Sequence, residues 1–179
     1  MGGFKKIHIC FLAVLLLLFI ACSSDDNQND FDPIENDGEI TFIVSGAINI
    51  EKSGQSTFYY VMGDYWEING FDGFENSTFN LLLKNNDNNI DGNREVGNYS
   101  IGGINDEVVG TLRLYEDGEF IEMYSSIHGS GATGELEVTY SSETKSEGNF
   151  SFKAFLSSDE SEEVIIEGHF SATPSPLIN

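Results

Sequence analysis

Cys22 is the residue whose surroundings point most clearly to a chemical reaction. It directly follows Ala21, and the chain before it carries Lys5 and Lys6 and then an apolar run over residues 7–20. A basic start, a short apolar core and a small residue before a cysteine are typical of a secretory signal that ends in a lipobox. We therefore expect cleavage between Ala21 and Cys22 and acylation of the Cys22 thiol. The acyl chains would then hold the protein to a membrane without a spanning segment.

Two other interpretations of this segment compete with acylation. A plain secretory signal, cut by another peptidase, is the main alternative. A membrane-spanning helix fits less well, because it needs about 20 apolar residues, whereas this run is shorter and is interrupted by His8. Phe19 departs from the lipobox, since leucine is more usual three residues before the cysteine.

The candidate metal site is a run of Asp and Asn residues near the middle of the chain. Asp87, Asn89 and Asp91 stand at the first, third and fifth positions of a calcium loop, and Gly92 stands at the sixth. The bidentate acid that such a loop carries at its twelfth position is missing, because Asn98 stands there. Calcium is the one cofactor that this pattern suggests, and a polar hairpin loop explains the same residues.

Tyr65 and Trp66 are the candidate ligand-binding residues. They belong to an aromatic group that also contains Phe58, Tyr59, Tyr60, Phe71 and Phe74. Tyr and Trp give large flat contact areas with a polar atom at one end, which suits a glycan, a peptide or a small apolar ligand. The alternative is that these aromatic residues line a β core. Because neighbouring strand residues face opposite ways, we expect one of Tyr65 and Trp66 to face outward.

No catalytic set is evident in the sequence. After signal cleavage only His128 and His169 remain, without a G-x-S-x-G nucleophile elbow. Residues 129–134 match the dinucleotide fingerprint G-x-G-x-x-G, but a strand follows them where a helix is needed, so a flexible turn is the better interpretation. With 30 acidic residues, some carboxylate pair will reach a hydrolytic spacing by chance. We expect no enzyme, and a carboxylate-dependent hydrolase is the least favoured alternative.

Charge and cysteine content limit the partners of this chain. Its formal net charge is −22, so it repels nucleic acid and anionic lipid, and we expect no nucleic-acid partner. Cys10 leaves with the signal and acylation would consume Cys22, so no disulfide or thiolate metal site is expected.

Composition divides the sequence into four segments. Residues 1–21 are the signal peptide, and residues 22–38 carry the acylated cysteine and an acidic tether that is too polar to order itself. As a flexible coil this tether would span about 20 Å or more. Residues 39–173 are long enough for a single domain. Residues 174–179 are a tail that begins at a proline, where a strand ladder stops.

Period-two alternation runs through the domain. Leu136, Val138 and Tyr140 alternate with polar residues, and the strands near the C-terminus repeat this pattern. The pair Asp117-Gly118 predicts a hairpin turn, and no window carries helical spacing. We predict an all-β fold, an antiparallel β-sandwich or barrel of about eight to ten strands.

The last strands also carry a recognisable signature. Residues 134–140 begin with glycine, Gly148 opens a G-x-F-x-F-x-A pattern, and residues 167–170 read E-G-x-F. Together these segments resemble the C-terminal signature of an uncharacterised family of small Bacteroidota outer-membrane lipoproteins, and residues 97–101 are similar to a G-x-Y segment of that group. Residues 23–26 resemble the acidic export signal of its surface lipoproteins. The resemblance implies an outer-membrane location, with the outward or inward side left open, and no activity.

Three classes of function follow from these observations. A lipid-anchored binding or accessory module is the leading hypothesis, because an anchor, a tether, a β scaffold and an aromatic segment are present without a catalytic set. A structural or interaction lipoprotein of the outer membrane is the second, and a hydrolase is the third.

Overall fold

The computed structural model describes residues 38–61, 65–73, 76–85, 94–103, 105–129, 131 and 133–175. Every regular element within these residues is a strand, which confirms the all-β prediction. The ten strands are β1 (Glu39–Gly46), β2 (Ile50–Val61), β3 (Tyr65–Phe71), β4 (Phe79–Asn85), β5 (Gly97–Ile101), β6 (Val108–Glu116), β7 (Glu119–Ser125), β8 (Gly134–Ser141), β9 (Ser146–Leu156) and β10 (Asp159–Pro174).

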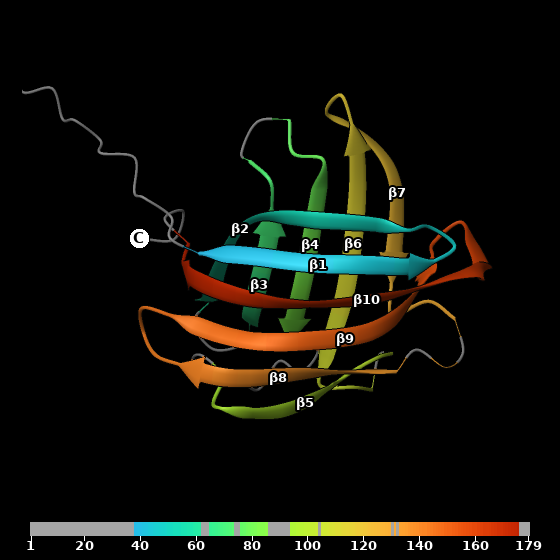
Figure 1. The fold of residues 1–179 in the computed structure, drawn as a ribbon. Coiled ribbons are helices and arrows are strands. Elements are labelled where there is room, and N and C mark those ends of the chain that lie inside the picture. The colour runs from blue at the N-terminus through green and yellow to red at the C-terminus, as the bar shows by residue number, and fades with distance from the viewer. Residues whose placement is uncertain are drawn as a thin grey trace, which may run out of the picture. The chain divides into compact units, whose positions relative to one another are not determined.

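These strands form one sheet that closes into a ring (Figure 1). The order is β1-β10-β2-β3-β4-β6-β5-β8-β9-β7, with further pairings between β1 and β2, β10 and β9, and β6 and β7. The ring is not a clear barrel, and it fits either of the two architectures expected.

Two pairings depart from the purely antiparallel sheet that we predicted. The end of β10 pairs in parallel with β2, where Thr173 lies opposite Thr57. The end of β5 pairs in parallel with the start of β6, where Ile101 lies opposite Val108. The first contact joins strands that are far apart in the sequence, and the second joins consecutive strands that run in the same direction. Alternation within a single strand carries no information about the partner of that strand or its direction.

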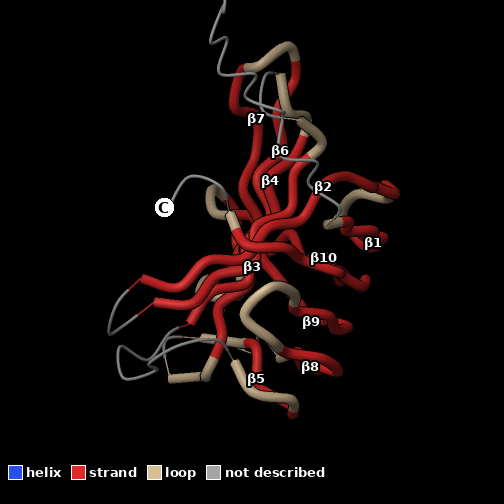
Figure 2. Tube along the Cα trace, turned by 90° about the vertical axis from the view of Figure 1, so that its left-hand side faces the viewer, coloured by secondary structure: helices blue, strands red, loops and turns tan. Residues whose placement is uncertain are grey.

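The strands lie in two layers that cross one another (Figure 1 and Figure 2). In Figure 1 the front layer contains β1, β10, β9, β8 and β5, while β3, β4, β6 and β7 run across them behind. The strand β2 belongs to both layers, because it pairs with β1 through Ile50–Gln55 and with β3 through Gln55–Val61. A continuous strand therefore ties the two layers together at Gln55.

The hydrophobic core lies between the layers. On β4, Phe79, Leu81 and Leu83 are buried, and the residues between them face outward. Phe79 meets Phe42 of β1 in an edge-to-face contact, with ring centroids 5.1 Å apart and an interplanar angle of 78°. Burying a side chain of this size stabilises the fold by roughly 1.5–3 kcal/mol, so such contacts across the layers are a main source of stability.

The strand β8 shows where the alternation pattern fails. Leu136 and Val138 are buried as predicted, but Tyr140, predicted on the same apolar face, is 48% exposed. The register between β8 and β9 shifts between Val138 and Tyr140. A bulge at this point re-aims the residues that follow it, so the prediction for Tyr140 is wrong and its ring faces solvent.

Candidate functional site

Trp66 is a core residue and does not form a binding surface. It lies on β3 with 0% of its surface exposed, packed in the same core cluster as Phe58 and Ile68. The prediction that Trp66 belongs to a ligand-binding loop is therefore wrong, and the alternative, an aromatic β core, is correct for this residue. The guanidinium carbon of buried Arg94 lies 6.0 Å from the centre of the Trp66 ring and 4.2 Å from that of Tyr99.

The other predicted site residues fall where the structure gives no description. Those outside the described residues are Ala21 and Cys22 of the lipidation site and Asp87, Asn89 and Asp91 of the calcium candidate. The backbone of Tyr65 belongs to β3, but its side chain is not described. Among the side chains that are described, no three of His, Cys, Asp and Glu lie close enough together to hold a metal ion.

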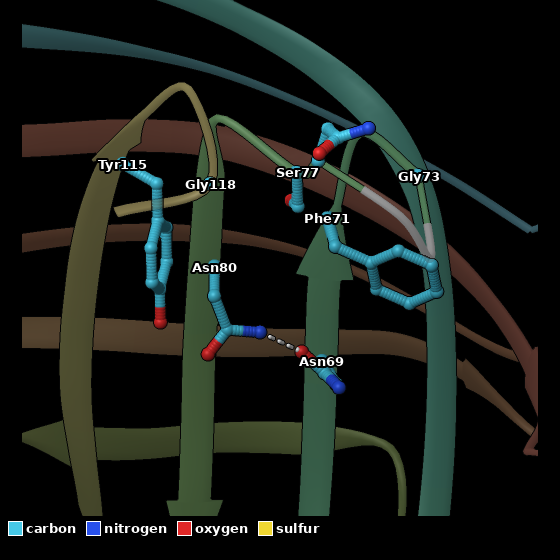
Figure 3. Close-up of a pocket in the computed structure, with 8 residues that line it drawn as sticks. Asn69, Phe71, Gly73, Ser77, Asn80, Tyr115 and Gly118 are labelled. Carbon is cyan, nitrogen blue, oxygen red and sulfur yellow. Dashed lines mark hydrogen bonds between the residues drawn. The ribbon is translucent and has the colours of Figure 1, made fainter. Parts of the chain in front are cut away.

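A pocket of about 350 Å³ opens on the outer face of β3, β4 and β6 (Figure 3). The described residues that line it are Asn69, Phe71, Gly73, Asn76, Ser77, Asn80, Tyr115 and Gly118. These residues combine amide and hydroxyl groups with two aromatic rings, and none of them carries a charge. The alternation of buried and outward side chains along β4 explains why Asn80 lies on the outer face. It stands between Phe79 and Leu81, which face the core.

Two asparagines from neighbouring strands form the centre of the pocket. Asn80 Nδ2 on β4 donates a hydrogen bond to Asn69 Oδ1 on β3, at 2.5 Å. Figure 3 shows the Oδ1 of Asn80 on the side of the Tyr115 ring and the Nδ2 of Asn69 on the opposite side. The hydrogen bond holds the two amides in a fixed mutual orientation.

The described residues between β3 and β4 that line the pocket, Gly73, Asn76 and Ser77, form one rim, and Asp72 bonds to this segment. Asp72 Oδ1 accepts hydrogen bonds from Ser77 Oγ at 2.7 Å and from the Thr78 amide at 2.6 Å, and Asp72 Oδ2 accepts one from Thr78 Oγ1. Burial opposes the ionisation of Asp72, but the hydrogen bonds from Thr78 and Ser77 outweigh it and hold the pKa of this carboxyl below its ordinary value of 3.8. An ionised carboxylate therefore organises the rim at neutral pH.

The turn between β6 and β7 forms the facing rim. Asp117 (φ 52°) and Gly118 (φ 80°) both adopt left-handed backbone conformations, as the two central residues of a type I′ hairpin turn do, which confirms the turn predicted from this pair. Asn76 of the other rim is also left-handed (φ 61°), and its Oδ1 would lie 3.6 Å from a side chain added at Gly118. The two rims therefore lie side by side.

The Tyr115 ring is positioned by contacts on both rims. The backbone amide of Tyr115 donates a hydrogen bond to the backbone carbonyl of Thr78 at 2.9 Å. The Tyr115 ring meets that of Phe120 edge to face, with centroids 6.1 Å apart and an angle of 74°. A tyrosine held in this way presents a flat, oriented surface to the pocket.

The residues of this pocket were not identified from the sequence. Asn69 and Phe71 fall within the aromatic segment described above, but the aromatic pattern favours Tyr65 and Trp66. The available signal was polar residues at outward positions of otherwise apolar strands, such as Asn80. A polar residue at an outward position does not identify a site until the neighbouring strands are known. The strand pairing shows that Asn80 lies opposite Phe71 of β3 on one side and opposite Arg113 of β6 on the other.

The chemistry available in the pocket is binding. Amides and hydroxyls donate and accept hydrogen bonds, and the rings offer apolar contact. His128 and His169 do not line it. His169 lies instead on β10, where its ring nitrogens are 3.1 and 3.2 Å from Thr41 Oγ1.

Comparisons with known proteins found no match. No protein-family model, no curated protein and no solved structure matches this chain. The described part of the chain also contains no helix with the length and hydropathy that crossing a bilayer requires.

Proposed function

We propose that this protein is a ligand-binding module, anchored to the outer membrane through acyl chains on Cys22, that takes its ligand in the pocket between β3, β4 and β6. The observation that carries the proposal is the combination of a hydrogen-bonded amide pair and an oriented tyrosine ring in one open pocket. The Bacteroidota resemblance and the lipobox support the location.

The pocket has the properties of a binding site. Binding pockets typically measure about 300–1,000 Å³ and place a few polar groups among apolar contacts. This one, at about 350 Å³, lies at the small end of that range. Its rims are fixed by hydrogen bonds before a ligand arrives, which lowers the entropy that binding costs.

The anchor and the charge of the chain fit this role. A tether of about 20 Å or more would hold the pocket clear of the lipid headgroups. The net charge of −22 keeps the domain from adhering to anionic lipid or nucleic acid. The partners of the module are therefore its membrane, through the acyl chains, and its ligand.

An interaction role is the second candidate, and one observation favours it. Phe120 and Ile121 on β7 are 58% and 48% exposed. As consecutive strand residues they point to opposite faces, so a partner that covers both would have to enclose this part of β7. A partner protein that covers β7 would make this chain an accessory subunit of a larger assembly.

The proposed function is tested by ligand binding to the full-length chain, purified from membranes in mild detergent. A panel of neutral oligosaccharides, oligosaccharides with uronic acids, and uncharged peptides is measured by calorimetry against the wild type and Tyr115→Ala. We expect at least one panel member to bind and its affinity to fall roughly tenfold or more in Tyr115→Ala, because the stacking surface is lost.

Tyr140→Ala is the matched control, since Tyr140 is an exposed tyrosine that lies on β8 in the other layer. It should bind as the wild type does. The emission of Trp66, the only tryptophan, reports whether each variant is folded, because the ring is fully buried. Absence of any binding that depends on Tyr115 would contradict the proposal.

A further inference from the structure

We infer that the ligand of this pocket is a neutral carbohydrate, which places a pair of neighbouring hydroxyl groups on Asn69 and Asn80 and an apolar face of its ring on Tyr115. This inference rests on the proposed function and names the ligand class for the same site. It follows from the hydrogen-bonding capacity of the amide pair, from the tyrosine ring and from the charge of the pocket.

Within the part of the chain that the structure describes, the amide pair leaves one amino group and one carbonyl oxygen without a hydrogen bond to the protein. With Asn80 Nδ2 bonded to Asn69 Oδ1, the atoms left are Asn80 Oδ1 and Asn69 Nδ2. Within the described residues, no protein group makes a hydrogen bond to either atom. The opposite choice of amide orientations exchanges the roles of the two residues, but it still leaves one amino group and one carbonyl oxygen.

A hydroxyl group matches this arrangement because it donates and accepts at once. Two hydroxyls on neighbouring ring carbons could satisfy the free oxygen and the free amino group together. A carboxylate or a phosphate has no proton to donate and would place a negative charge against the free amide oxygen. An ammonium group carries only donors, so it could not accept a hydrogen bond from Asn69 Nδ2.

The aromatic side of the pocket suits a sugar ring. One face of a pyranose carries C–H groups, which pack on a flat aromatic surface, while its edge carries hydroxyls. Figure 3 shows Tyr115 beside Asn80 on neighbouring strands, so that a ring stacked on the tyrosine would turn its edge toward the amides. Phe120 holds the Tyr115 ring edge to face and limits its rotation.

The net negative charge of the chain and the uncharged lining residues that the structure describes disfavour uronic acids, which are the acidic counterparts of neutral sugars. The described lining residues are uncharged, the Asp72 carboxylate holds the adjacent rim, and the chain as a whole carries −22. A uronic acid would be repelled by the chain as a whole on approach. It would also find no cation among the described lining residues, since the nearby Lys52 and Arg113 do not line the pocket.

The test compares the wild type with Asn69→Asp in the full-length chain. The new carboxylate still accepts the hydrogen bond from Asn80 Nδ2, so the amide contact and the fold are kept. Only the atom that faces the pocket changes: the Nδ2 donor of Asn69 becomes a charged carboxylate oxygen, which can only accept. We expect the affinity for a neutral oligosaccharide from the panel to fall at least about tenfold, with the melting temperature unchanged.

A second measurement does not depend on any variant. In the wild type labelled with ¹⁵N-asparagine, the side-chain amide resonances of Asn69 and Asn80 should shift in a saturable way with the same oligosaccharide. If Asn69→Asp does not fold, Asn69→Ala, which removes the donor without adding a charge, takes its place. The signal of Asn149, on the other layer, should not move.

The outcomes separate this inference from the proposed function. Neutral oligosaccharide binding that Asn69→Asp weakens supports both. Binding that depends on Tyr115 but is restricted to a uronic acid or a peptide, or that leaves the amide resonances unmoved, overturns the carbohydrate inference and keeps the binding module. If nothing binds in a way that depends on Tyr115, the proposed function itself fails.

Discussion

Tyr124 combines a ring in the core with a hydroxyl that meets a carboxylate. The residue is 1% exposed, and its hydroxyl donates a hydrogen bond to Glu122 Oε2 at 2.9 Å. Burial, with the added effects of Glu122 and Glu162, raises the pKa of Tyr124 to about 12, from an ordinary value of 10.0. Both the desolvation and the negative neighbours penalise the phenolate.

This shift predicts a loss of stability in strongly basic solution. Because the folded state holds the Tyr124 proton more tightly than the unfolded state, its contribution is complete below pH 10 and is lost as the pH rises toward 12. We expect the free energy of unfolding in urea to fall by roughly 2–3 kcal/mol more in the wild type than in Tyr124→Phe over this interval. Equal slopes for the two proteins would contradict the assignment.

At the scale of the strands, β9 and β10 pack through reciprocal glycine and phenylalanine pairs. Gly148 lies opposite Phe170, and Gly168 lies opposite Phe150. A Cβ atom added at Gly148 would lie 2.8 Å from the Phe170 ring, and one added at Gly168 would lie 2.7 Å from the Phe150 ring. The C-terminal G-x-F and E-G-x-F patterns are therefore a packing device in which each ring covers a glycine of the neighbouring strand.

Gly148→Ala tests this packing. The added methyl group would lie only 2.1 Å from the Glu137 carbonyl oxygen as well as close to Phe170, so strand or ring must move. We expect a loss of about 1–3 kcal/mol in the free energy of unfolding, measured in urea. Ser53→Ala, at an exposed strand position, is the control and should change it by less than about 0.5 kcal/mol.

The strands also show what alternation can predict. It predicted the class, and it placed Leu136 and Val138 in the core correctly. It failed at Tyr140, because a bulge changes the face without changing the pattern. It offered two interpretations for Trp66, which lies in the core. The pocket joins residues from three strands and two loops, and which strands are neighbours is decided by pairings that a single strand does not encode.

For the whole molecule, the dominant quantity is charge. A net charge of −22 opposes the compact state through self-repulsion. Among the described residues, the two salt bridges are Lys145 with Glu147 and Lys153 with Glu163, both on the surface. Such pairs offset little of the repulsion.

Salt should therefore stabilise this protein. Raising the ionic strength from about 0.01 M to 0.15 M shortens the screening length from about 30 Å to about 8 Å, and we expect the melting temperature to rise. Sodium and potassium chloride should act equally, and a melting temperature that is independent of salt would contradict this account. Calcium chloride should exceed magnesium chloride at equal ionic strength only if the Asp87 loop binds calcium.

The two-sided pairing of β1 has a mechanical consequence. This strand pairs with β2 over Glu39–Val44 and with β10 over Glu39–Gly46, and in the sequence it directly follows the tether. A pull along the axis of β1 would load both ladders in shear, so many hydrogen bonds would have to break together. A domain anchored in the way that we propose would therefore resist unravelling from its N-terminal strand when force acts on a bound ligand.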